Sequence, residues 1–504
     1  MIPCILAHDL GTSGNKASLF GTDGRLVDSA VVSYSPIYPK RGWAEEDAGQ
    51  WWYAVCEATK AVLKRNPEVS VEAVAVSGQM MGCLPLDRNG NPLGNSLIWS
   101  DARAEAECER ITGRVTRERY NRITGQPPSA SYSLPKILWQ KEHTPEIYEK
   151  AYKYVQAKDF INFMLTGRIV TDPTDAAYTI AYDIAEQDWS GEILECAGIP
   201  KSLFPEVVPC ETIVGKVTKE ASLSCGIPEG TPVAAGAGDG SAAHLGAACV
   251  EPGDSYLCLG SSTWLVTQTD RLILDGGGRL QSEPHVIPKQ YVYLGTMQTG
   301  GLAHSWAKHH LSSPPLSYSE IEDMVSESGP GAGGILFLPY LMGERSPWYD
   351  LRARGAFLGI HQETSQGDFY RAVMEGVAFN LKLLLNVIEQ DTKVEEIVLI
   401  GGGGKSRGWR QILSDVFQKK ICLPANVEEG TSIGGALIAG VGVGIFPDYS
   451  VAKEFMTIEE TVDPSPETGA YYEEMGRIFE DSYHSLKEIS HRLSTLPDVW
   501  QGQT

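Results

Sequence analysis

The stretch "HDLGTSGNKASLF" (residues 8–20) decides how this chain begins to fold. An apolar run, residues 4–7, leads into Asp9, and a turn of glycine and small hydroxyl residues comes next. A second apolar run follows Lys16, and Thr22-Asp23-Gly24 has the composition of a hairpin turn. The pattern predicts three consecutive strands joined by tight turns.

The next segments extend this pattern. Residues 47–66 predict a helix with an N-terminal Asp cap, and residues 71–78 predict a buried strand. This order differs from the βαβ unit that opens a dinucleotide-binding domain, which argues against a dehydrogenase. Residues 253–270 repeat the strand–turn–strand opening. We therefore predict two domains, residues 1–248 and 249–504.

Two glycine-rich segments and a tail complete the second half. Residues 394–417 predict a strand, a glycine loop and a helix. Residues 428–444 predict a helix of small residues that packs very close to a neighbour, and residues 464–495 predict a surface helix. The middle of the chain, residues 100–230, reads as helix-rich with proline-containing loops.

Composition limits the partners. The chain has 504 residues, 42% of them hydrophobic, and 64 acidic against 42 basic side chains give a net charge of −22. Such a surface disfavours nucleic acid and anionic membranes. Ten cysteines without a CxxC pair indicate reduced thiols in a cytoplasmic protein. We find neither a signal peptide nor a run of 18 apolar residues.

The opening turn has the composition of a phosphate-binding loop. Gly11 allows a tight turn whose NH groups point inward, and Thr12 and Ser13 add hydroxyl donors. Asp9 can hold Mg²⁺, and Lys16 can add positive charge at the same edge. The alternative is an ordinary hairpin with a capping Asp.

A second acid lies in "GAGDG" (residues 236–240). Small residues on both sides of Asp239 leave space for a ligand, and a carboxylate can accept the proton of a sugar hydroxyl during phosphoryl transfer. A tight-turn Asp is the alternative.

The run "GGGGKS" (residues 401–406) lacks the Walker A spacing because position 399 is Leu399. Either an adenine or ribose lies against it, or it is a connection without a ligand.

A group of candidate sugar ligands follows the strand at 71–78. Amide, carboxylate and guanidinium groups can bind hydroxyls, and an indole can stack on an apolar sugar face. Core packing of the methionines and an ion pair of the arginine are the alternatives. The candidates are Gln79, Met80, Met81, Trp99, Asp101 and Arg103.

These stretches together resemble the FGGY carbohydrate kinases, and most closely their xylulokinase-like branch. The resemblance runs in the family's order from about residue 5 to 445. It is carried by "DLGTSGNKASLF", "GWAEEDAGQWW", "SGQMMG", "IWSDAR", "LPKILW", "GAGDGSAAHLG", "GSSTW", "LPYLMGERSPWYDLRARGAFLGI", "GGGGKSRGWRQILSD" and "EEGTSIGGALIAGVG".

The resemblance implies an α/β fold of two ribonuclease-H-like domains around a central cleft. It implies that Asp239 is the catalytic base and that the loop after Asp9 faces the transferred phosphate. Asp9 itself would help to hold Mg²⁺. ATP would lie mostly on the second domain and the sugar on the first. The implied nucleotide contacts are Gly260, Ser261, Ser262, Gly301, Gly401, Gly402 and Gly403.

Two positions depart from the xylulokinase pattern. Met81 stands where that pattern has His, and Gly240 stands where it has Asn. Loss of two polar contacts is expected to change sugar selectivity. We therefore expect an ATP- and Mg²⁺-dependent kinase of a small sugar, most simply a ketopentose such as D-xylulose. The alternatives are a kinase of another polyol or of an aldonate such as gluconate, and a non-catalytic relative that binds sugar or nucleotide. Family analogy favours a homodimer.

Overall fold

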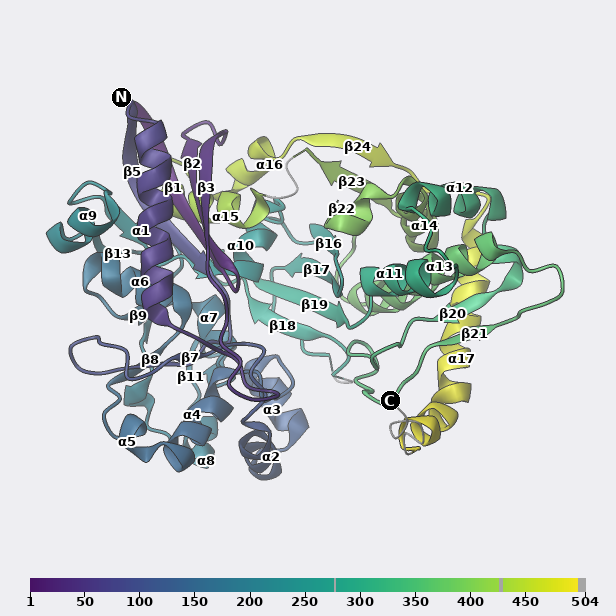
Figure 1. Cartoon of the computed structure of the whole chain (residues 1–504), viewed down its shortest axis with the longest axis horizontal. Helices are drawn as coiled ribbons and strands as arrows, with labels where there is room; N and C mark the ends of the chain where they lie inside the picture. The colour runs from purple at the N-terminus through teal and green to yellow at the C-terminus, as the bar shows by residue number, and fades with distance from the viewer. Residues whose placement is uncertain (276–277, 426–428, 497–504) are drawn as a thin grey trace.

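The computed structural model describes residues 1–275, 278–425 and 429–496. Two seven-stranded sheets stand beside each other, with a helical region below the first and helices packed around the second (Figure 1). The first sheet contains, in spatial order, β13 (Ile213–Lys216), β14 (Pro232–Ala234), β5 (Val69–Gly78), β1 (Ile2–Gly11), β2 (Gly14–Gly21) and β3 (Leu26–Ser33), with β15 (Ala237–Gly238) also paired to β5.

The second sheet repeats the central arrangement of the first. β1 is antiparallel to β2 and parallel to β5, and β16 is likewise antiparallel to β17 and parallel to β22. This duplication is the one expected of two ribonuclease-H-like domains. In spatial order the second sheet contains β18 (Gln281–Pro284), β19 (Tyr291–Met297), β17 (Thr263–Thr269), β16 (Ser255–Leu259), β22 (Glu396–Ile400), β23 (Lys420–Pro424) and β24 (Ile458–Val462).

Helix α1 (Ala48–Arg65) confirms the helix predicted over 47–66. The Asp47 side chain accepts a hydrogen bond from Gly49 N at 2.8 Å, which satisfies one of the free N–H groups of the first turn. Trp51 and Val55 lie on the buried face of α1, which packs against β2 and β3. The amphipathic pattern therefore seats the helix on the first sheet.

The helical region below the first sheet comes from the middle of the chain, as predicted. Short pairs of strands connect its helices: β4 (Glu45–Glu46) with β7 (Ser96–Leu97), β6 (Leu84–Leu86) with β8 (Lys153–Val155), β9 (Val170–Thr171) with β12 (Glu206–Val207), and β10 (Tyr182–Asp183) with β11 (Asp188–Trp189). The helices are α2 (Glu105–Arg114), α3 (Arg117–Thr124), α4 (Ser133–His143), α5 (Pro145–Tyr148), α6 (Ala157–Thr166), α7 (Pro173–Ala177), α8 (Gly191–Ala197) and α9 (Lys219–Cys225).

The second sheet packs against a long buried helix, α13, whose first turn is closed by a reciprocal cap between Ser365 and Asp368. The tail forms α17, which confirms the predicted terminal helix, although residues 497–504 lie outside the described part. The helices and the strand pair of this half are α11 (Gly301–His310), α12 (Tyr318–Ser328), α13 (Gln366–Ile388), α14 (Arg407–Phe417), α16 (Ala452–Phe455), α17 (Gly469–Ser494), and β20 (Leu336–Leu338) with β21 (Ala356–Leu358).

Two helices rich in small residues, α10 (Asp239–Gly246) and α15 (Gly430–Gly442), pack against each other where the halves meet. A Cβ atom on Gly434 would lie 2.0 Å from Ala242 O, so this approach requires glycine. The predicted close-packing helix is confirmed from Gly430 onward; residues 426–428 lie outside the described part. Although α15 belongs to the second half in sequence, it packs on β1 and β5 of the first sheet.

Candidate active site

A two-residue turn, Thr12 and Ser13, joins β1 to β2. In the register of this hairpin Asp9 lies directly opposite Lys16, so both side chains stand on one face of the sheet. Lys16 Nζ lies 3.1 Å from Glu429 Oε2, at the start of α15. The predicted phosphate loop is therefore a tight hairpin whose carboxylate and ammonium are neighbours.

The side chains of the hairpin turn contact two of the predicted sugar ligands. Thr12 Oγ1 donates to Gln79 Oε1 at 3.3 Å and accepts from Trp99 Nε1 at 2.9 Å. Gln79 Nε2 in turn donates to Glu46 Oε2 at 2.6 Å. Burial raises the pKa of Glu46 to about 7. These bonds orient the Gln79 amide and bring two motifs that are distant in sequence to one place.

Asp239 is the first residue of α10, directly after β15. The chain reaches it through Gly236, where φ is +79° and a Cβ atom would lie 1.9 Å from Val76 O. Gly238 N then donates to Thr174 Oγ1 at 2.9 Å. A close approach to β5 and a hydrogen bond to α7 thus fix the backbone that carries the acid.

The two predicted acids face the same cavity, which has a volume of about 510 Å³. Burial and the nearby charge of Asp9 raise the pKa of Asp239 to about 7. Burial also raises the pKa of Asp9, although Lys16 opposes this effect. Two carboxyl groups that share one cavity and both have raised pKa values favour a bound cation or a bound proton.

Both halves of the chain form the walls of this cavity. The first half contributes Gln79, Met80, Met81 and Trp99, four of the candidate sugar ligands, and helix α10 adds Gly240 and Ser241. One face of the second sheet forms the opposite wall. Its side chains include Tyr256, Trp264, Val266, Glu283, Val292 and Leu294. These second-sheet residues and Tyr178 were missed by sequence reasoning, because alternation in a strand does not reveal which face meets a ligand.

Met81 has an unusual backbone. Its φ is +68°, in the left-handed region that non-glycine residues rarely occupy. The adjacent Met80 is 8% exposed and packs under the Asp239 segment, where a Cβ atom on Gly238 would lie 2.5 Å from Met80 Cε. Met80 therefore both packs against the backbone of Gly238 and lines the cavity. The strained backbone of Met81 is typical of residues in functional loops.

A larger cavity of about 820 Å³ lies against the second sheet. Five predicted nucleotide contacts line it: Gly260, Ser261, Gly301, Gly402 and Gly403. Side chains not foreseen from the sequence complete the lining, among them Tyr318, Glu322, Lys405, Arg407 and Trp409. Ser262 and Gly401 are outside this lining; Gly401, with φ of +91°, packs against the backbone of Leu259. Part of the glycine run, Gly402 and Gly403, therefore lines this cavity.

Asp101 and Arg103 lie beside the first cavity and do not line it. The Asp101 carboxylate is fully buried and accepts from Ala44 N at 2.6 Å and from Arg103 Nη2 at 2.7 Å. Arg103 also pairs with Glu45 at 2.8 Å and stacks over the Trp43 ring at 3.7 Å. The ion-pair interpretation of Arg103 is confirmed, and a direct sugar contact for either residue stays a prediction.

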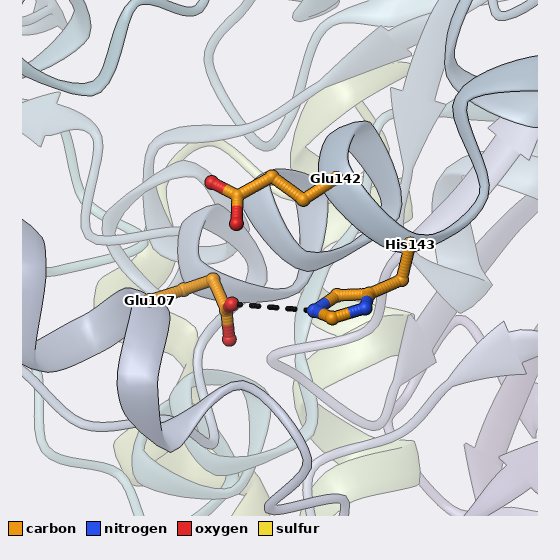
Figure 2. A group of neighbouring side chains, drawn as sticks. All are labelled: Glu107, Glu142 and His143. Atoms are coloured by element: carbon orange, nitrogen blue, oxygen red, sulfur yellow. Dashed lines mark ion pairs between the residues drawn. The ribbon is translucent and has the colours of Figure 1, made fainter.

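Two further groups of potential metal ligands lie outside both cavities. Glu107 on α2 and the pair Glu142 and His143 on α4 point toward one another (Figure 2), with His143 Nε2 3.7 Å from Glu107 Oε1. Arg110 pairs with both glutamates, so this group acts as an ion-pair cluster that joins two helices. The other group is Asp159, Asp172 and Asp175, gathered around Lys158.

Both halves of the chain match models of one protein family. Residues 4–246 match the N-terminal domain of the FGGY family of carbohydrate kinases, and residues 256–443 match the C-terminal domain of that family. The chain belongs to the FGGY family. This FGGY kinase is therefore an enzyme that phosphorylates a sugar, and ATP is its co-substrate.

Individual relatives agree with this assignment. The chain is 31% identical over 503 residues to a xylulose kinase of Lactococcus lactis, which covers 98% of this chain and 99% of the relative. The structure of ligand-bound xylulose kinase from Lactobacillus acidophilus has a TM-score of 0.92 at 27% identity and covers 98% of this chain and 100% of that one. The gluconate kinase structure from the same organism has a TM-score of 0.91 at 27% identity, with coverage of 96% and 98%.

The family resemblance and the two-domain α/β fold are thus confirmed. Within the described residues, no helix of this FGGY kinase combines the length and apolar character needed to cross a membrane. The domain boundary at 248/249, the homodimer, the cytoplasmic location and the individual roles of the site residues stay predictions.

Proposed function

We propose that this FGGY kinase transfers the γ-phosphoryl group of ATP to a hydroxyl of a small sugar, with Asp239 as the general base. A ketopentose such as D-xylulose is the first acceptor to test. The observation that supports the proposal is the meeting of Asp9 and Asp239 at one cavity walled by both halves. Residues 1–248 would provide the acceptor side and residues 249–504 the nucleotide side.

In this mechanism the acceptor hydroxyl gives its proton to the Asp239 carboxylate while its oxygen attacks the γ-phosphorus. The bond from that phosphorus to the bridging oxygen breaks, and ADP leaves. A pKa of about 7 suits this role, because such a carboxyl is about half ionised at neutral pH and can hold the proton it receives. The hydroxyls of Thr12 and Ser13 would donate hydrogen bonds to the transferred group.

The residues around Asp9 fit a magnesium ion. The Asp9 carboxylate faces the cavity, its burial raises its pKa, and carboxylate oxygens are the ligands that Mg²⁺ prefers. When bound, the ion would neutralise charge on the phosphates of ATP. Lys16 pairs with Glu429 and lies opposite Asp9 in the hairpin. It can therefore add positive charge at the edge of the sheet that carries Asp9.

The nucleotide would occupy the glycine-lined cavity of the second half. Gly402 and Gly403 permit a flat base or ribose to approach the backbone, and Ser261 offers a hydroxyl donor. The rings of Tyr318 and Trp409 add apolar surface for an adenine. Ser262, Gly260, Gly301 and Gly401 belong to the same proposal through the family resemblance.

A coupled assay of ADP release tests the proposal. With ATP and Mg²⁺, at least one member of a panel of ketopentoses, polyols and aldonates should stimulate release. Asp239→Asn should reduce that rate by about three orders of magnitude or more, because the base is lost. The matched control is Asp448→Asn, which changes an exposed carboxylate that caps Ser450 N. Near-normal turnover of Asp239→Asn would refute the base assignment.

A further inference from the structure

One face of the second sheet provides a wall of the acid-bearing cavity. Trp264 and Val266 on β17 lie opposite Thr296 and Leu294 on β19, and all four side chains line the cavity. Glu283 on β18 lies directly opposite Val292 in the next register. Among the described side chains of this wall, Glu283 carries the one carboxyl group.

Glu283 is 5% exposed and has a single visible partner. Tyr178, which follows α7 in the first half, donates its hydroxyl to Glu283 Oε1. Among the residues that the structure describes, no donor reaches Oε2 and no cation forms an ion pair with this carboxyl. A carboxylate has about four acceptor sites, so most of its hydrogen-bonding capacity is unused. Burial without a cation raises the pKa of Glu283 to about 7, and a hydrogen-bond donor on a ligand in the cavity would favour the ionised form.

The rest of the cavity lining is also without positive charge. Asp9, Asp239 and Glu283 contribute three carboxyl groups, and the described lining contains no Lys or Arg. His244 lines the cavity as well, but burial and the adjacent His285 lower its pKa, so its ring is neutral. Lys136, next to this cavity, donates from Nζ to three backbone carbonyls, including Met81 O at 3.0 Å, and burial lowers its pKa to about 7.

We propose that Glu283 is a specificity-determining residue of this kinase, which binds a hydrogen-bond-donating end of the acceptor and excludes an acceptor that carries a carboxylate. The inference rests on the proposed function, in which Asp239 receives the proton of the reacting hydroxyl and Mg²⁺ offsets the charge of Asp9. Glu283 then holds the opposite end of the same acceptor. Its partner is a hydroxyl or an ammonium group.

The physical basis is the difference between paired and opposed groups at a carboxyl that is 5% exposed. Above pH 7, where Glu283 is ionised, a donor on the acceptor satisfies Oε2, whereas an aldonate carboxylate would face a like charge and would leave both groups without donors. Sites built on such polar pairing discriminate by on the order of 100-fold or more. Glu283 therefore disfavours the binding of an aldonate such as gluconate.

Glu283 and Tyr178 also connect the two halves, which suggests a rival role as a tether. A tether acts on the position of the halves and changes the binding of every acceptor by a similar factor. A residue that contacts the acceptor directly changes the ratio of the dissociation constants of different acceptors. Tyr178→Phe removes the connecting hydrogen bond and keeps the carboxylate, so the two roles can be separated.

The test uses three probes with one carbon skeleton: D-glucitol, D-gluconate and 1-amino-1-deoxy-D-glucitol. Their dissociation constants are measured on the full chain at pH 8.5, where the Glu283 carboxyl is ionised, by tryptophan fluorescence, because Trp99 and Trp264 line the cavity. Wild type, Glu283→Gln and Tyr178→Phe are compared. Glu344→Gln is the control, since Glu344 is a buried carboxyl in the same half with its pKa raised to about 8 by burial and lies outside the cavity lining.

We expect wild type to bind D-gluconate at least about tenfold more weakly than D-glucitol, and Glu283→Gln to reduce that ratio to near one. Binding of the amine should weaken most in Glu283→Gln. Tyr178→Phe should change all three constants by a similar factor, and Glu344→Gln should match wild type. Equal binding of glucitol and gluconate by wild type, an unchanged ratio in Glu283→Gln, or no binding of any probe would overturn the inference.

A measurement of ADP release distinguishes failure of the Glu283 inference from failure of the proposed kinase function. ADP release is measured on the same samples with the full acceptor panel. Discrimination that depends on Glu283, without acceptor-stimulated ADP release, would refute phosphoryl transfer while retaining the selectivity role. Acceptor-stimulated release with preference for an aldonate would retain the kinase and refute the role of Glu283.

Discussion

Asp239, at the first position of α10, faces the same cavity as Asp9 of β1, and the charge of Asp9 helps to raise the pKa of Asp239. The two acids are 230 positions apart in the chain (239 − 9). Helix α10 brings them together because it leaves the first sheet beside the hairpin that carries Asp9. This pairing leads to two predictions about pH.

The stability of the ligand-free protein should depend on Asp239. Its pKa is about 7 in the folded protein against an ordinary value of 3.8, so the folded state binds more protons between these values. Stability contributed by this group is therefore lost as pH rises toward 7. We expect Asp239→Asn to melt at a higher temperature than wild type at pH 8, and the difference to shrink at pH 5. Thermal unfolding at both pH values measures this, and an equal difference at both would contradict it.

The rate should follow the ionisation of the same group. A general base acts only when deprotonated, so log kcat/KM should rise with pH below about 7 and level off above it. Direct detection of ADP between pH 5 and 9 measures the profile. A flat profile down to pH 5 would show that another group accepts the proton.

Met81 is predicted to limit activity on D-xylulose. Its φ of +68° is a conformation that His tolerates, and a Cβ atom on Gly240 would have Met80 Sδ as its nearest neighbour at 3.9 Å. Met81→His combined with Gly240→Asn restores the two polar groups of the xylulokinase pattern. We expect kcat/KM for D-xylulose to rise by about tenfold relative to that for other ketopentoses. No change in this ratio would show that selectivity lies elsewhere in the cavity.

Contact between α10 and α15 should be sensitive to a single methyl group. Gly434→Ala places a Cβ atom 2.0 Å from Ala242 O, and the overlap should destabilise the protein by about 3 kcal/mol or more. Gly113→Ala in α2 is the matched control, because nothing lies within 4 Å of its Cβ position. That change should be neutral or stabilise by about 0.5–1 kcal/mol. Denaturant unfolding of both variants distinguishes a packing effect from a general effect of removing glycine.

Thr174 is predicted to position the segment that carries Asp239, the proposed base. Its hydroxyl accepts from Gly238 N at 2.9 Å and donates to Asp172 Oδ1. Thr174→Val leaves the buried Gly238 N–H unpaired, which should cost about 1–3 kcal/mol of stability. We expect kcat to fall by about tenfold with little change in KM, because Asp239 moves relative to the bound acceptor. Thr174→Ser should restore both values; failure of this rescue would exclude the hydrogen bond as the cause.

Much of the fold could be predicted because its elements are local. Asp47 begins α1, glycine and hydroxyl residues close the β1–β2 hairpin, and both effects come from residues next to one another. The candidate acids were also visible, since each is followed or flanked by small residues. Arg103 shows the limit. Its residue type suits a sugar ligand or an ion pair, and only the positions of Asp101 and Glu45 decide for the ion pair in this structure.

The sequence by itself determined the duplicated strand–turn–strand openings, the family and the two acids, because these depend on short runs of residues whose order is read directly. Tertiary structure alone decided that α15 returns to the first sheet and that Glu283 faces the cavity. It also decided that Arg103 forms an ion pair with Glu45. The physical reason is that local backbone preference acts over a few residues, whereas these contacts join segments far apart in the chain, and only tertiary packing brings them within reach.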